Sequence, residues 1–187
     1  MKRKDNRAAI KQLTVCSMMV ALGVVLLGIG SLFEVLDISM AVLASFCVII
    51  AVIEYGKGAP WMVYAATSIL ALILIPNRLP AVFFTCFFGF YPILKDKLER
   101  KSKIFKWILK EIIFNVSLAA MMVIYFLLVP ESLSAESLSI PFINLPLPWL
   151  LAFFVLLCEI VFVLYDIALK RITIFYIVKL RHRLKLK

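Results

Sequence analysis

One acidic residue, Glu159, lies deep inside an apolar stretch of this 187-residue sequence. It follows Trp149 by ten residues, so in a helix it would lie about 15 Å further along the axis, near the middle of a hydrocarbon layer about 30 Å thick. A charged side chain at that depth costs on the order of 2.5 to 3.5 kcal/mol on insertion scales and typically faces a water-filled cavity or a binding site. The position therefore predicts a ligand or ion contact at Glu159, and a hydrogen-bonded structural glutamate is the alternative.

Other polar side chains in apolar stretches have plainer interpretations. Asp166 lies seven residues after Glu159, on the same helix face, but it is near the inner boundary and four residues before Lys170, which favours an ion pair between the two. Four further residues favour interhelical hydrogen bonds over ligand contacts: Thr67, Ser68, Asn115 and Ser117.

Two short polar turns, around Glu34 and Asp37 and around Asn77 and Arg78, would face one another if the first four helices form a bundle. We hypothesise that Glu34 and Asp37 form the outer gate of an outward-opening pocket whose floor is Glu159. Solvated loop charges are an equally weighted interpretation. The predicted ligand contacts are Glu159, Arg78, Asn77, Tyr125 and Trp149.

The sequence lacks the residue patterns of an enzyme. Its one histidine, His182, lies in a basic tail, and no HExxH, GxSxG or Asp-rich metal motif is present. Its four cysteines fall in four separate apolar segments without CxxC spacing, which is typical of buried thiols. We expect neither catalysis nor a metal or cofactor.

The composition indicates a membrane protein. Hydrophobic residues make up 64% of the chain and the mean hydropathy is +1.05, far more than a soluble domain of this length could bury. The formal net charge is +10, but the basic residues flank apolar segments and do not alternate with aromatics. Anionic lipid headgroups are therefore the expected partner, and nucleic acid is not.

Six apolar runs predict six membrane-spanning helices, over 12–33, 38–53, 59–75, from the turn at 76–80 to 94, 112–129 and 149–166. The charged stretch 95–101 is expected to be a solvated loop. Runs two to four are only 16 or 17 residues long, or about 24 to 26 Å as helix, so runs three and four could instead form a re-entrant hairpin.

The basic residues predict the orientation. Six crossings place 20 of the 21 Lys and Arg residues on one side and leave only Arg78 on the other, and the positive-inside rule makes the basic side cytoplasmic. The prediction is an all-α, polytopic six-helix bundle with both termini in the cytoplasm. It forms a single membrane domain, with a basic N-terminal segment 1–11, a bundle 12–170 and a basic tail 171–187 on the membrane surface.

Several local patterns occur together in this chain. Small residues stand four apart in the first helix, at Ser17 and Ala21, and the second helix carries the Ala- and Leu-containing stretch 39–44. A tight turn at 54–60 contains Gly56, Gly58 and a proline, and the fourth run carries Gly89 before a basic loop. In these respects the chain resembles the substrate-binding S components of energy-coupling factor (ECF) transporters.

The resemblance implies a multi-pass protein of the bacterial plasma membrane that captures a vitamin-like small solute. Its partners would be a coupling membrane subunit, docked at Ser17 and Ala21, and separate ATPase subunits. The alternative is a non-transporting membrane scaffold similar to the small rod-shape-determining membrane proteins, which would need neither Glu159 nor an outer cavity.

Overall fold

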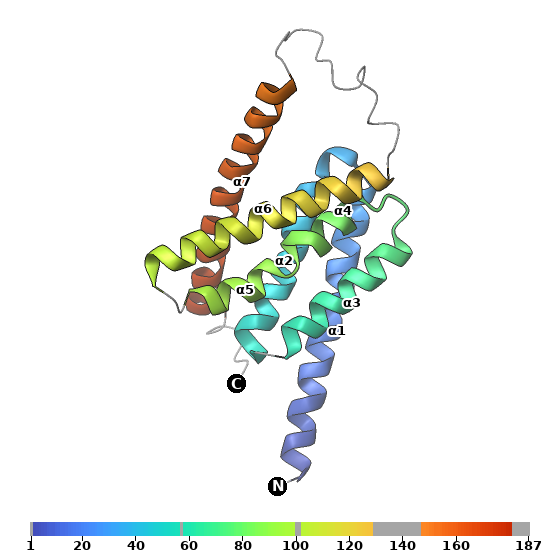
Figure 1. The fold of residues 1–187 in the computed structure, drawn as a ribbon. Helices are drawn as coiled ribbons and strands as arrows, with labels where there is room; N and C mark the ends of the chain where they lie inside the picture. The colour runs from blue at the N-terminus through green and yellow to red at the C-terminus, as the bar shows by residue number, and fades with distance from the viewer. Residues whose placement is uncertain (1, 57, 100–101, 129–146, 181–187) are drawn as a thin grey trace. The chain divides into compact units, whose positions relative to one another are not determined.

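The computed structural model describes residues 2–56, 58–99, 102–128 and 147–180, and within these ranges every regular element is a helix (Figure 1). The chain divides into two compact units, residues 1–121 and 122–187. The predicted all-α fold class is thus confirmed for the described part of the chain.

The first unit contains most of the helices. They are α1 (Lys2–Leu32), the short 3₁₀ helix η1 (Glu34–Leu36), α2 (Asp37–Tyr55), α3 (Ala59–Leu74), α4 (Leu79–Phe83), the π-helix η2 (Phe84–Phe88) and α5 (Tyr91–Leu98); α6 (Lys103–Leu128) begins in this unit and ends in the second. Gly56 ends α2 with φ 71°, a conformation that favours glycine, and Pro60 lies in the first turn of α3, where its missing N–H is tolerated.

The core of the first unit lies around the segment 79–98. Helix α1 packs on α2 and α3, and α2 also packs on α4, η2 and α5. Of the most apolar part of Leu79–Leu98, 61% of the residues are buried, against 17% to 39% in the other three long apolar helices. The discontinuous segment α4–η2–α5 is therefore the central element of this unit.

Glycines allow two of these close contacts. A Cβ added at Gly30 of α1 would lie 2.9 Å from Cβ of Met40 in α2, and one added at Gly23 would lie 3.0 Å from Cγ2 of Thr67 in α3. Small residues of this kind let membrane helices approach closely.

The second unit contains α7 (Leu147–Phe175) and the π-helix η4 (Tyr176–Leu180). The sixth predicted run was expected to leave the membrane near Asp166 to Lys170 and to continue as a helix in the basic tail, and the described residues are helical as far as Leu180. The alternation of apolar and basic residues after 170 is compatible with a helix, so no local signal ends it. Residues 181–187, with His182, lie outside the described residues.

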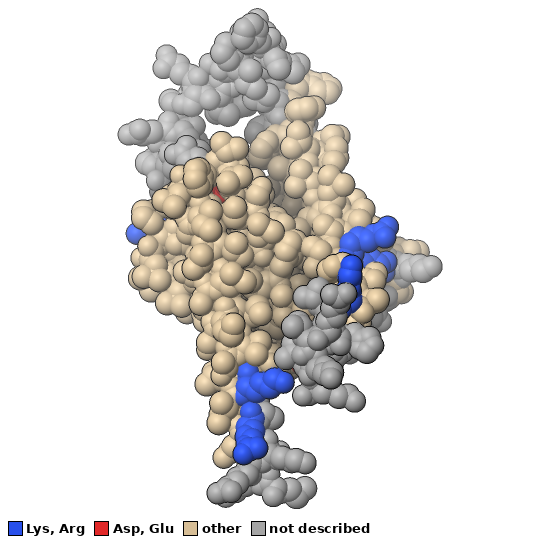
Figure 2. Space-filling model, turned by 180° about the vertical axis from the view of Figure 1, so that it is seen from behind, with Lys and Arg blue, Asp and Glu red and all other residues tan. Residues whose placement is uncertain are grey.

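Four helices in the described part of the chain are long and apolar enough to cross a membrane: Ala9–Leu32, Asp37–Tyr55, Leu79–Leu98 and Ile104–Ile124. Helix α3, with 16 residues, is apolar but shorter. Arg7 and Lys11 are exposed near the N-terminal end of α1, where Figure 2 shows basic side chains next to a broad uncharged surface.

The predicted solvated loop at 95–101 is wrong in its first half. Helix α5 continues to Leu98, and Lys95 is buried with only 4% of its surface exposed. Basic residues favour the last turn of a helix, where the carbonyl ends of the backbone dipoles gather, and the aliphatic stem of lysine packs well in apolar surroundings. Charge alone therefore did not mark the end of this helix.

Candidate functional site

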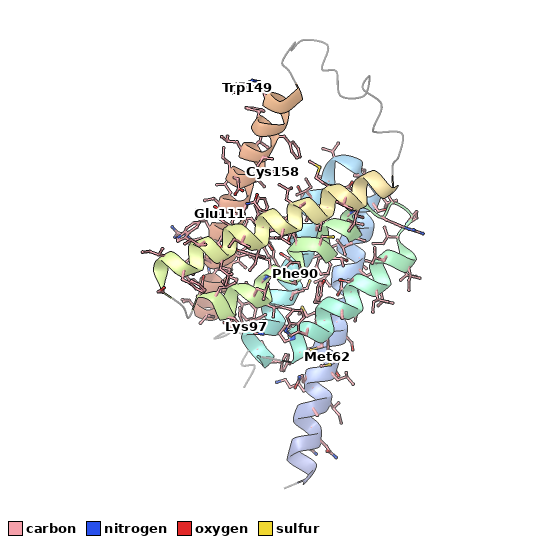
Figure 3. All side chains as sticks on the ribbon, viewed as in Figure 1. Met62, Phe90, Lys97, Glu111, Trp149 and Cys158 are labelled. Atoms are coloured by element: carbon pink, nitrogen blue, oxygen red, sulfur yellow. The ribbon has the colours of Figure 1, made fainter. Side chains whose placement is uncertain are left out.

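The central segment changes helix type in the middle. In η2 the N–H of Gly89 donates to the carbonyl of Phe84, five residues back, at 2.7 Å. Pro92 has no N–H, and the N–H of Ile93 donates to Phe90 at 3.1 Å, so the carbonyls of residues 88 and 89 lack the donors of a continuous α-helix. We call residues 84–92 the helix break; Phe90 marks its place in Figure 3. Single-turn π segments occur frequently at functional sites.

Tyr64 of α3 is bound directly to the helix break. Its hydroxyl donates a 2.8 Å hydrogen bond to the carbonyl of Thr85. Its ring lies against Gly89, where an added Cβ would come within 2.6 Å of the ring carbon Cδ2. Phe84 and Phe90 flank the same ring at centroid distances of 6.2 and 6.3 Å. Glycine at position 89 is thus what allows the tyrosine to reach the backbone of the break.

Buried hydroxyl groups lie beside this contact. Thr67 is 1% exposed and Ser68 is 5% exposed, both on α3 within one turn of Tyr64. The Oγ1 atoms of Thr67 and Thr85 are buried and have no hydrogen-bond partner among the described residues. An unbonded hydroxyl in apolar surroundings is costly, so these two oxygens are candidates to bind a polar ligand or a water molecule.

Thr67 was predicted to form an interhelical hydrogen bond. Its Oγ1 has no hydrogen-bond partner among the described residues, and its methyl group lies against Gly23 of α1. In α6 the hydroxyl of Ser117 donates to Ile113 at 2.8 Å, one turn back in the same helix. The side-chain amide of Asn115 likewise donates to the backbone carbonyl of Glu111, one turn back, at 3.1 Å. Hydroxyls bond readily to the preceding turn of their own helix, which leaves less capacity for contacts between helices.

A row of contacts connects the helix break to the end of α5. The ring of Trp61, in the first turn of α3, meets Tyr64 edge to face at 5.9 Å. The Nζ atom of Lys97 lies 5.8 Å from the centre of the Trp61 ring, within the range of a cation–π interaction. Figure 3 labels Lys97 on α5. On the other side of the break, Phe87 packs on Tyr91 and Phe114 at 4.9 and 5.3 Å.

The two predicted outer turns do lie together. The backbone N–H of Asn77 donates to Oγ of Ser31 at 3.3 Å, which joins the turn before α4 to the end of α1. The side-chain Oδ1 of Asn77 accepts the N–H of Leu79 at 3.2 Å and so stabilises the start of α4. Sequence reasoning missed Ser31, because one hydroxyl at the end of an apolar helix carries no distinctive signal.

The charged residues of these two turns differ in their exposure to solvent. Arg78 is exposed, as a solvated or solute-contacting residue would be. Asp37 is buried, with 6% of its surface exposed, as the first residue of α2. A carboxylate at a helix N-terminus interacts favourably with the backbone dipoles, so Asp37 is not a solvated loop charge. The side chain of Glu34 lies outside the described residues, and the gate stays a prediction.

The remaining predicted contacts belong to the second unit. Glu159 is partly buried in α7, Asp166 is buried about two turns further along the same face, and Trp149 is exposed at the start of α7. The side chain of Tyr125 lies outside the described residues. Asn77 and Arg78 belong to the first unit, so the pocket predicted around Glu159 stays a prediction.

The predicted docking residues lie at the surface of α1. Ser17 and Ala21 are both exposed, and the hydroxyl of Ser17 donates to the carbonyl of Leu13 at 2.9 Å. Cys16, Gly23 and Leu27 on the opposite side of the helix are buried. One face of α1 is therefore packed, and the two small residues lie on an exposed face.

No group of three or more His, Cys, Asp or Glu side chains that could hold a metal ion occurs among the residues whose positions are described. All four cysteines are free thiols. No protein-family model, curated protein or solved structure matches the chain.

Proposed function

We propose that this chain is the substrate-binding membrane subunit of an ECF-type importer, which captures a vitamin-like small solute and depends on separate ATPase subunits for energy. The observation that carries the proposal is the exposed face of α1 with Ser17 and Ala21 four residues apart. A small-xxx-small face on a membrane helix lets the backbone of a second helix approach closely. The coupling membrane subunit would occupy this face.

The helix break supports a role in solute binding. Discontinuous membrane helices supply backbone carbonyls and polar side chains to the solute sites of many transporters. Here Pro92 and the hydrogen bond from Ile93 to Phe90 interrupt the α-helical pattern, and the same unit holds the hydroxyls of Thr67 and Thr85, which have no hydrogen-bond partner among the described residues. The proposed contacts of the solute remain Glu159 at the floor of the pocket, Arg78 and Asn77 in its upper wall, and Tyr125 and Trp149.

The proposed topology has six crossings with both termini in the cytoplasm of a bacterium. The bond between Asn77 and Ser31 supports a full crossing by the third and fourth runs, because it brings their connecting turn level with the end of α1, whose span Ala9–Leu32 is 24 residues long. A shallow re-entrant hairpin would end at a lesser depth.

Co-purification tests the proposal. The full chain, tagged and expressed in a host that carries an ECF coupling module, should retain the coupling and ATPase subunits. Ser17→Trp and Ala21→Trp should reduce the retained subunits at least about tenfold, because indole bulk separates the two helix axes. The matched control is Leu22→Trp, since Leu22 is also exposed but lies about 100° further round the helix.

The thermal midpoint of unfolding should be the same in all three tryptophan variants, because each changes an exposed position. If both Ser17→Trp and Ala21→Trp retain the ATPase subunits, the exposed face of α1 is not the docking site. Co-purification of cell-wall synthesis enzymes in place of ATPase subunits would favour the scaffold.

A further inference from the structure

We infer that the helix break is a hinge in the first unit and that Tyr64 is the latch which holds it closed. The inference concerns a motion of the segment 79–98 and does not depend on which solute or partner the chain binds. Three features carry it: the switch in hydrogen-bond register at η2, the bond from Tyr64 to Thr85, and the close seat of the tyrosine ring at Gly89.

The carbonyl of Thr85 has a different hydrogen-bond donor in η2 from the one it would have in a regular α-helix. In a regular α-helix the N–H of Gly89 would donate to Thr85, four residues back. In η2 it donates to Phe84 instead, and the carbonyl of Thr85 accepts the hydroxyl of Tyr64. The tyrosine hydroxyl thus satisfies the carbonyl that the π register leaves without its α-helical donor. Loss of this bond removes a contact that holds the segment in the π register, and the backbone hydrogen bonds of the break should then open more often.

The segment cannot become one continuous α-helix. Pro92 lacks the N–H that would donate to the carbonyl of Phe88, and its ring would clash with that carbonyl. A change of register at Phe84–Phe88 therefore alters the angle between α4 and α5 and leaves both helices intact. Breaks of this kind, at π turns and prolines, are where helices bend. The break is therefore the point in the segment 79–98 at which the angle between α4 and α5 can change.

Gly89 makes the latch possible. A Cβ at this position would stand 2.6 and 2.8 Å from two ring carbons of Tyr64 and 2.9 Å from a ring carbon of Phe84. Contacts this short force the tyrosine ring to move away, and the ring cannot move without lengthening the bond from its hydroxyl to Thr85. Alanine at position 89 should therefore open the latch by sterics, whereas phenylalanine at position 64 opens it by removing the hydroxyl.

Hydrogen exchange measured by mass spectrometry on the full chain in lipid nanodiscs tests the latch, because it detects local opening of backbone hydrogen bonds. Tyr64→Phe should increase the rate of deuterium exchange in peptides covering 84–93 by about two- to thirteenfold, the change expected when a net hydrogen-bond contribution of about 0.5 to 1.5 kcal/mol is lost. Peptides from α1 and α2 should exchange as in the parent chain. Gly89→Ala should have the same local effect.

Gly28→Ala is the matched control, because a Cβ at Gly28 meets no atom within 4 Å and the residue lies in α1. Uptake at 84–93 that is unchanged or slower in Tyr64→Phe would overturn the latch. So would an increase of the same size in α1 and α2, which would show a general loss of stability. Tyr64→Phe keeps the ring and its packing, so the test stands even if Gly89→Ala does not fold.

Discussion

At the scale of single residues, glycines determine how closely α1 approaches its neighbours. Gly30 faces Cβ of Met40, an atom that can move only with the backbone of α2, whereas Gly28 faces open space. The two positions are two residues apart in the same helix and offer a direct comparison.

Gly30→Ala should lower the free energy of unfolding by about 1 to 3 kcal/mol, because the added methyl group must push α1 and α2 apart. Gly28→Ala should be neutral or stabilise the protein by up to about 1 kcal/mol through helix propensity. Reversible unfolding with SDS in mixed micelles measures both. Equal stability of the two variants would mean that α1 and α2 can separate without cost.

Glu159 gives a second prediction for a single residue. We expect the purified parent chain to carry a bound small molecule that mass spectrometry detects, and Glu159→Leu to lose more than about 90% of it, because a buried ligand group loses its polar partner. Glu159→Gln should retain part of the binding, since an amide still forms hydrogen bonds. A folded Glu159→Leu chain that binds the same solute equally well would remove Glu159 from the site, and a chain that only loses stability would make it structural.

At the scale of elements, the cation–π contact between Lys97 and Trp61 joins the last turn of α5 to the first turn of α3. The same Trp61 ring packs on Tyr64, so this contact also supports the latch side of α3. The predicted loop at 95–101 would have left Lys97 in solvent, and only the extension of α5 to Leu98 brings it over the ring.

A double-mutant cycle with Lys97→Gln and Trp61→Leu should give a coupling energy of about 0.5 to 1 kcal/mol in the unfolding free energy. Lys97→Arg should retain the coupling, because a guanidinium group also stacks on indole. Additive effects of the two single substitutions would show that the contact contributes nothing to stability.

At the scale of the whole molecule, the proposed orientation follows from the basic residues, and the exposed turn at Arg78 provides the outer test point. A chain without its four cysteines, carrying Arg78→Cys, should react with a membrane-impermeant maleimide in intact cells. Ser102→Cys, at an exposed position just before α6, should react only after the membrane is opened. The reverse pattern would invert the orientation, and failure of Arg78→Cys to react would favour a re-entrant hairpin over two crossings.

The sequence by itself determined where α2 and α3 lie. Long apolar runs predicted 38–53 and 59–75, and the structure has α2 at Asp37–Tyr55 and α3 at Ala59–Leu74. These boundaries are local, because Gly56 and Pro60 end and begin helices through their own backbone chemistry. The meeting of the first two outer turns was also predictable, since antiparallel neighbours joined by short connections share an end.

Only the tertiary structure decided the helix break and its latch. Gly89 and Pro92 within one apolar run are a signal for an irregular helix, but they do not say which register the chain adopts. That choice depends on Tyr64, 21 residues from Thr85 in sequence, whose hydroxyl takes the carbonyl that the π register leaves open. The burial of Asp37 and Lys95 has the same origin, because the exposure of a charged side chain depends on which elements pack around it and not on its neighbours in the chain.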